Sequence, residues 1–166
     1  MSPRRLVPTI LTLCLTSALV ATFPTDAHAA GTWVWPVSGP VIRGFDPPDS
    51  PYGSGHRGID IAAAVGTPVL APAPGTVTFA GQVAGHLFVT IDHGGGLEST
   101  YSWLSAILVR KGDGVDAAAV IAASGTGHPT DLVPNLHMGV KLDDVYVDPL
   151  DYLGPISVSG YIRLAP

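Results

Sequence analysis

Two short segments of the sequence carry residue types that bind metal ions. The first, "HRGID", contains His56 and Asp60, and the second, "NLHMGV", contains His137. Side chains two or four residues apart in a β-strand point to the same face of the sheet. A strand with His56 and Asp60 beside a strand with His137 would therefore offer three nitrogen and oxygen ligands. Zinc accepts such a set, and catalytic zinc sites keep a fourth position open.

Neither motif alone separates a ligand set from ordinary structural residues. A single histidine is more often a surface or core residue than a ligand. An aspartate four residues after a histidine also fits a turn cap. Gly58, between the first two candidate ligands, would leave room for water or a substrate. The spacing by itself leaves both interpretations open.

The elements that must position these residues are short and rich in β-forming residues. Gly and Pro, which number 20 and 16, separate the strand-like segments. These segments are "WVWPV", "HRGIDIAA", "GTPVLAP", "GTVTFAGQV", "HLFVTIDH", "LESTYSWL", "AVIAAS", "NLHMGVKL" and "VYVDPL". The pattern predicts an all-β domain, mostly an antiparallel sheet with tight turns. "HGGG" (93–96) predicts a hairpin turn, residues 45–55 a surface loop, and "DPLDYL" (148–153) one short helical turn.

The first 29 residues have the pattern of a secretory signal peptide. Arg4 and Arg5 precede an apolar run, and "AHA" (27–29) is a small-x-small cleavage site, which predicts cleavage near Ala29. An uncleaved membrane anchor is the alternative, which Pro8 within the run disfavours. We therefore expect a secreted protein with a domain at residues 30–153, an irregular tail at 154–166 and no stable membrane anchor.

Cysteine usage and charge exclude several classes of function. The only cysteine, Cys14, lies in the apolar run after Leu13, where a lipoprotein signal requires a small residue. The mature chain would then contain no disulfide and no thiolate metal site. Without Arg4, Arg5 and Asp26, it has 6 basic and 12 acidic residues. This balance, without a basic stripe, makes nucleic acid an unexpected partner.

From Val34 to Leu153, the sequence resembles the lysostaphin/LytM-type zinc metallopeptidases, which cut peptidoglycan cross-bridges and stem peptides. The blocks that carry the resemblance are "GHRGIDIAAAVGTPVLAPAPGTVTFAG", "VTIDHGGGLESTYSWLSAILVRKGDGV", "NLHMGV" and "VDPLDYL". The resemblance implies that His56, Asp60 and His137 bind one Zn²⁺. It also implies a split barrel or sandwich with a groove over the metal, and peptidoglycan peptides or cross-bridges as partners.

Two positions depart from the family pattern. The family carries His-x-His in its last block, and the first histidine, which is catalytic, is Asn135 here. The family also carries a histidine two residues after the hairpin tyrosine, and after Tyr101 this position is Trp103. The chain is also similar to a secreted actinobacterial subgroup that has "GHP" before a "LHWG"-like motif and lacks these histidines.

Other residues are candidates for the missing chemistry. His128, in the loop before the His137 strand, could reach the metal, and a loop histidine without a role is the alternative. Tyr101 could polarise a substrate carbonyl or be a cross-strand aromatic residue. We expect a structural role for His93 and a surface position for His86.

These losses bear directly on activity. A positioned acid or base contributes about 10²–10⁴-fold to rate, and neither Asn nor Trp can carry a proton. The sequence therefore predicts a weak or inactive peptidoglycan hydrolase, associated with the cell wall, that binds peptidoglycan or regulates another wall hydrolase. The alternative is an active zinc endopeptidase in which His128 carries the proton. A structural zinc domain without a wall ligand is the third hypothesis, so whether the chain is an enzyme stays open.

Overall fold

The computed structural model describes residues 31–50, 53–128 and 131–155 of the 166-residue chain. The signal peptide expected at 1–29 and residues 156–166 of the expected tail lie outside the described residues. The strands are β1 (Val41–Arg43), β2 (Ile59–Ala62), β3 (Pro68–Leu70), β4 (Gly75–Val83), β5 (His86–Asp92), β6 (Leu97–Ile107), β7 (Gly114–Val115), β8 (Val120–Ser124), β9 (Asn135–Leu142) and β10 (Val145–Val147), and a 3₁₀ turn, η1 (Pro149–Asp151), follows them.

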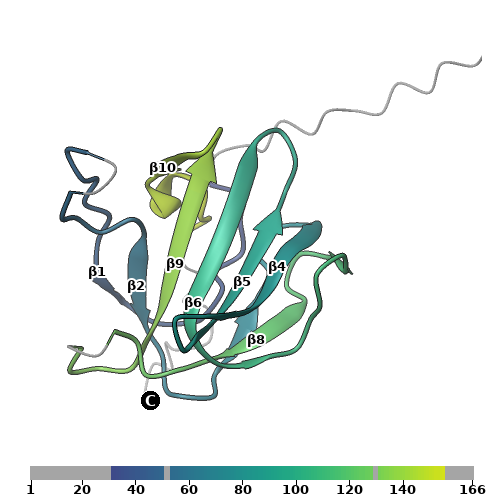
Figure 1. Cartoon of the computed structure of the whole chain (residues 1–166), viewed down its shortest axis with the longest axis horizontal. Coiled ribbons are helices and arrows are strands. Elements are labelled where there is room, and N and C mark those ends of the chain that lie inside the picture. Colours follow the sequence, from purple (N-terminus) through teal and green to yellow (C-terminus); the bar gives the residue numbers. More distant parts are fainter. Residues whose placement is uncertain (1–30, 51–52, 129–130, 156–166) are drawn as a thin grey trace, which may run out of the picture.

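The described strands form one antiparallel sheet. Its main path runs β1-β2-β9-β6-β5-β4-β7, while β10 pairs with β9, and β8 pairs with both β3 and β6. Figure 1 shows β9 and β6 side by side at the centre, with β1 and β2 on one side and β5 and β4 on the other. The sheet does not close into a barrel, and the expected all-β, antiparallel fold is confirmed. Within the described residues, no helix is long and apolar enough to cross a membrane.

The long strand β6 changes its partner part-way along. Its residues up to Ser102 pair with β9, whereas those from Leu104 onward pair with β8. Trp103 lies between the two segments with a φ of 61°, a left-handed conformation that is unfavourable for a bulky side chain. Because β5 pairs with the other edge of β6, β8 and β9 occupy successive parts of the same edge.

The core lies on one face of the sheet and sets the orientation of the candidate ligands. The residues of β2 and β9 that point into it are Ile59, Ile61, Leu136, Met138 and Val140, all fully buried. Asp60 and His137 occupy the intervening positions and therefore point to the opposite face. A one-residue slip of either strand would expose its apolar residues, at about 1.5–3 kcal/mol for each side chain. Core packing thus fixes the register that brings the two ligands together.

Most expected strands are present, and the differences have physical reasons. "WVWPV" (33–37) forms no strand, and only an isolated bridge joins Trp33 to Leu153. The short edge strands β1 and β7 were not expected, because two or three residues give no alternating pattern. The hairpin is confirmed by a glycine turn with positive φ at Gly94–Gly96, and η1 confirms the helical turn.

Candidate metal centre

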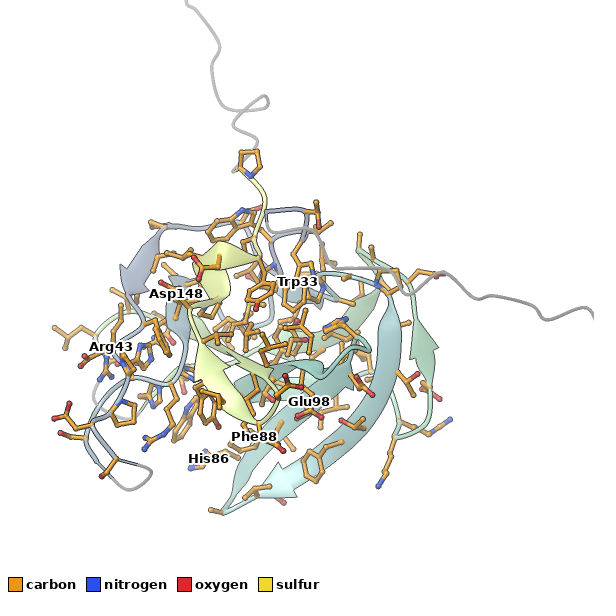
Figure 2. All side chains as sticks on the ribbon, turned by 90° about the horizontal axis from the view of Figure 1, so that it is seen from above. Trp33, Arg43, His86, Phe88, Glu98 and Asp148 are labelled. Atoms are coloured by element: carbon orange, nitrogen blue, oxygen red, sulfur yellow. The ribbon has the colours of Figure 1, made fainter. Side chains whose placement is uncertain are left out.

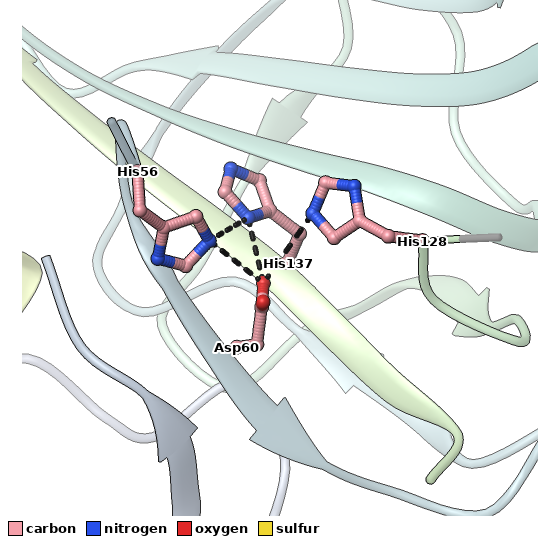
Figure 3. Close-up of side chains that lie close together, drawn as sticks. All are labelled: His56, Asp60, His128 and His137. Atoms are coloured by element: carbon pink, nitrogen blue, oxygen red, sulfur yellow. Dashed lines mark hydrogen bonds and ion pairs between the residues drawn. The ribbon is translucent and has the colours of Figure 1, made fainter. Parts of the chain in front are cut away.

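Four side chains from three parts of the chain converge on one point (Figure 3). They are His56, Asp60, His128 and His137, and one ligand atom of each lies within 4.8 Å of the others. Asp60 and His137 are direct partners across β2 and β9. His56 precedes β2, and His128 lies in the loop between β8 and β9. The three ligands expected from the sequence are therefore brought together, along with one of the two further candidates.

Three of the four atoms form a compact triangle. Asp60 Oδ1 lies 2.8 Å from His137 Nδ1 and 3.1 Å from His56 Nε2, and the two nitrogens are 3.1 Å apart. Ligand atoms held at about 2 Å by a tetrahedral ion are roughly 3.3 Å apart. The triangle therefore has nearly the size that such an ion requires.

His56 is held in the tautomer that a metal ligand needs. Its Nδ1 lies 2.7 Å from the carbonyl oxygen of Gly44. Because a carbonyl can only accept, Nδ1 donates and the lone pair of Nε2 points at Asp60 Oδ1. Two acceptors that face each other at 3.1 Å require a cation or a proton between them. This arrangement fits the carbonyl–histidine–metal pattern of known sites.

The sequence-based account of "HRGID" was wrong in two details. His56 is not in the same strand as Asp60, but two backbone hydrogen bonds to Asp46 hold it in an isolated bridge. Gly58 does not leave room for water, because a Cβ there would lie 2.2 Å from the carbonyl oxygen of Met138. The glycine instead allows β9 to approach the segment between the two ligands.

The Asp60 carboxylate is ionised in this environment. Burial raises its pKa, but hydrogen bonds and charge from His137 and His56 act in the opposite direction, so that its pKa falls well below the ordinary value of 3.8. The side chain is only 1% exposed. A buried carboxylate that stays charged between imidazoles is the anionic part that a cation site needs.

His128 adds a third imidazole at a slightly larger distance. Its Nε2 lies 3.7 Å from Asp60 Oδ1, and its ring centre lies 5.2 Å from that of His137. Among the described residues, this buried Nε2 has no hydrogen-bond partner. Burial lowers the pKa of His128, which the charge of Asp60 opposes only in part. The neutral imidazole is therefore favoured, with a nitrogen directed at the ligand triangle.

Asn135 anchors the loop that carries His128. One oxygen of Asp131, Oδ2, accepts hydrogen bonds from the backbone N–H of His128 at 2.7 Å and from Asn135 Nδ2 at 2.8 Å. Asn135 also donates to the carbonyl oxygen of Val133 at 3.0 Å, and its side chain is fully buried. The backbone of Gly127 packs closely against it. Sequence reasoning missed Asp131, because a side chain that accepts from the backbone N–H three residues earlier is a usual signal for Glu or Gln rather than for Asp.

The two aromatic candidates lie in different environments. The centroid of the Trp103 ring lies 3.9 Å from that of the His86 ring and 4.9 Å from that of the His128 ring. Trp103 therefore lies beside the metal group. Tyr101 is fully buried in the core, its hydroxyl donates to Ser99 Oγ at 3.0 Å, and burial raises its pKa. Tyr101 is therefore not among the residues that converge on the metal group.

His93 also lies in the core rather than at the metal group. Its Nε2 lies 2.7 Å from Ser99 Oγ, and its Nδ1 donates to the carbonyl oxygen of Pro74 at 2.9 Å. These contacts tie the hairpin after β5 to the sheet. They agree with the structural role expected for His93, whereas His86, expected at the surface, is half-buried against Trp103.

A family model described as Peptidase family M23 matches residues 54–149, which include all four converging residues. The chain belongs to peptidase family M23. The expected relationship to the lysostaphin/LytM-type peptidases is thereby confirmed. The match begins just before His56 and ends in η1, so it covers most of the described M23 sheet.

Two relatives are similar to this chain over most of its length. An uncharacterized protein of Mycobacterium bovis is 38% identical over 98% of this chain and 65% of its own length. The murein hydrolase activator NlpD of Salmonella dublin is 31% identical over 87% of this chain and 39% of its own length. The chain thus spans less than two thirds of both relatives.

Two solved structures are similar to this chain in sequence and fold. A zinc-containing peptidase from Vibrio cholerae is 30% identical, with a TM-score of 0.63 over 75% of this chain and 41% of that one. The antimicrobial peptidase lysostaphin from Staphylococcus simulans is 26% identical, with a TM-score of 0.66 over 84% of this chain and 60% of that one. Sequence and structure therefore agree on the family.

Proposed function

We propose that this chain is a secreted, zinc-dependent hydrolase of peptidoglycan peptides in which the loop residue His128 carries the proton. The observation that supports it is the position of the His128 imidazole, 3.7 Å from Asp60 at the ligand triangle. The positions at which the family carries proton-transferring histidines are Asn135 and Trp103. An imidazole from the loop is thus present where two from the sheet are absent.

His56, Asp60 and His137 would hold the zinc ion, because their three ligand atoms have the required spacing and His56 has the required tautomer. Zinc bound there would supply a Lewis acid that polarises a peptide carbonyl and makes water more acidic. The neutral Nε2 of His128 would accept a proton from the attacking water and return it to the leaving amine. Asn135 and Asp131 would keep this nitrogen in place by holding the loop.

Export and wall association form part of the proposal. They rest on the signal-peptide pattern of residues 1–29, which leaves residues 30–153 as the peptidase domain and 154–166 as a tail. The name of the Salmonella relative refers to murein, the wall polymer that lies outside the membrane. Peptides or cross-bridges of this polymer are the substrates proposed here.

The decisive experiment compares His128→Ala with the unmodified mature chain on purified walls. We expect zinc-dependent release of free amines by the native protein, and a loss of about 10²–10⁴-fold in the variant. Metal content, measured by mass spectrometry, should be nearly unchanged. His86→Ala is the matched control, since His86 also contacts Trp103 but lies outside the ligand group. Equal cleavage by native protein and His128→Ala would refute the role of His128.

A second candidate is a non-catalytic activator of another wall hydrolase. Asn135 and Trp103 favour it, because neither can transfer a proton, and so does the similarity to a murein hydrolase activator. In that case the zinc-loaded chain alone would release no amines, but it would accelerate another wall hydrolase added to the same assay. His128→Ala would leave this acceleration unchanged.

A further inference from the structure

Arg43 lies beside the metal group on the same face of the sheet. It is the register partner of Asp60 across β1 and β2, and directly opposed residues project to the same face. Figure 2 labels it next to the ribbon of β1. A shallow pocket of about 340 Å³ is lined by both Arg43 and Asp60. Arg43 thus borders a pocket that Asp60, a residue of the metal group, also lines.

The neighbouring carboxylates are engaged with other groups. Asp60 directs Oδ1 at His56 and His137, and Asp131, which lines the same pocket, accepts hydrogen bonds from His128 and Asn135. Among the ion pairs of the described residues, none includes Arg43. Its side chain is exposed, so its donors can meet an incoming anion.

The backbone next to Arg43 is fixed to the site. The carbonyl oxygen of Gly44 accepts the hydrogen bond from His56 Nδ1, and Arg43 pairs with Asp60 across β1 and β2, so two contacts join this segment to the metal group. Arg57 lines a different pocket together with Tyr146. That pocket contains none of the four metal-group residues, whereas the pocket lined by Arg43 contains Asp60.

We propose that Arg43 is a carboxylate-binding residue, and that the site takes peptides with a carboxylate close to the bond that is cleaved. A guanidinium binds a carboxylate through two parallel N–H···O bonds. The remaining walls of the pocket include the exposed apolar side chains of Ile42, Leu132 and Val133, which suit small apolar residues next to that carboxylate. This inference names the substrate class of the proposed hydrolase and rests on that proposed function.

The test is NMR titration of the zinc-loaded mature chain with three short peptides. Ala-Gln-Ala-Ala with a C-terminal amide has no carboxylate. The same peptide with a free C-terminus, and Ala-Glu-Ala-Ala amide, each place one carboxylate at a different position. The variants are Arg43→Gln, Arg43→Lys and, as the matched control, Arg110→Gln, an exposed arginine in the turn between β6 and β7.

The native chain should bind one carboxylate peptide about 10- to 100-fold more tightly than the neutral peptide, the range for a hydrogen bond to a charged group. Arg43→Gln should lose this preference, Arg43→Lys should keep a smaller part of it, and Arg110→Gln should keep all of it. Whichever carboxylate peptide shows the preference identifies the recognised position.

Three results would overturn the inference. They are equal binding of all peptides by the native chain, an unchanged preference in Arg43→Gln, and a preference in Arg43→Gln that disappears when zinc is removed. The last result would show that the metal ion, and not Arg43, binds the carboxylate of the peptide. Because binding is measured without cleavage, an Arg43-dependent preference in a chain that cleaves no wall would support this inference while the proposed hydrolase fails.

Discussion

The two sides of the metal group are built from different kinds of structure. On one side, Asp60 and His137 are hydrogen-bonded neighbours in the centre of the sheet, and the core on the opposite face fixes their register. On the other side, His128 stands on a loop that two side chains, Asp131 and Asn135, hold to the base of β9. A ligand on the sheet cannot move without unpairing strands, whereas the loop group depends on a few polar contacts.

This difference implies that holding a metal and transferring a proton are separable in this protein. Changes in the sheet should affect metal binding first and activity as a consequence. Changes in the loop should affect activity while metal remains bound. The variants below are chosen to test that separation.

The largest expected effect comes from the sheet side. Asp60→Asn keeps the shape of the side chain but removes the charge between two imidazoles. Loss of an outer partner of a metal ligand costs about 10–100-fold in affinity, so loss of a ligand should exceed 10²-fold in zinc affinity. Competition with a chromogenic chelator measures it. Asp116→Asn, at an exposed position, is the control, and equal zinc affinity in the two variants would remove Asp60 from the ligand set.

The next effect comes from the loop anchor. Asn135→Ala removes the donor to Asp131, so His128 should lose its fixed position. A misplacement of about 1 Å can cost on the order of 10²-fold in rate, while zinc affinity should change little. Wall cleavage and chelator competition on one preparation measure both quantities.

A double-mutant cycle sharpens this test. Asp131→Ala breaks the same contact from the other side, so the double variant should be no worse than the poorer single variant. Additive losses would show that Asn135 and Asp131 act separately, and that Asn135 does not anchor the loop.

A smaller effect is expected in the core. Tyr101→Phe removes the hydroxyl that donates to Ser99, which should lower the free energy of unfolding by about 0.5–1.5 kcal/mol. Activity should stay the same, because Tyr101 is fully buried away from the metal group. Urea unfolding and wall cleavage test the two parts. A tenfold loss of activity in a stably folded Tyr101→Phe variant would show that Tyr101 contributes to the active site after all.

The smallest expected effect is a displaced pH profile. The pKa of His128 lies below its ordinary value of 6.5 because burial disfavours the charged form, and a nearby cation would act in the same direction. The neutral base should persist as pH falls through 6.5, whereas a histidine of unshifted pKa keeps about a quarter of its neutral form at pH 6.0. The rate at pH 6.0 should therefore exceed a quarter of its plateau. In Asn135→Ala the loop should expose His128, so the acid limb of the pH–rate profile should shift towards pH 6.5. Identical acid limbs in the native chain and the variant would contradict the anchoring role of Asn135.

The residues of this site differ in how far the sequence predicts them. Asp60 and His137 follow from strand alternation, because the apolar residues around them dictate which face each side chain takes. His56 was expected in the same strand, yet it is held by Asp46 and Gly44, and those backbone contacts leave no trace in the pattern of residue types.

Asn135 shows a different limit. The sequence identifies it as a replaced histidine, which is a statement about what is missing. Only the structure shows what it contacts, because its partner Asp131 lies in a loop whose conformation no periodicity specifies. The all-β fold was predictable from the turn residues, but the short edge strand β1, and with it the place of Arg43, was not.

The shared edge of β6 has a consequence for how such a site can change over evolutionary time. β8 ends at Ser124 opposite Leu104, and β9 brings His137 opposite Ser102. The segment between β8 and β9 therefore begins and ends at neighbouring positions along the same edge of β6. The sheet holds the two ends of this segment together whatever the length of the segment. Each doubling of a loop's length raises the free energy of loop closure by only about 0.6 kcal/mol. Segments of different length and composition can therefore be exchanged at this point without disturbing the ligands, so a lineage can acquire, lose or relocate a proton carrier while it inherits the metal site intact.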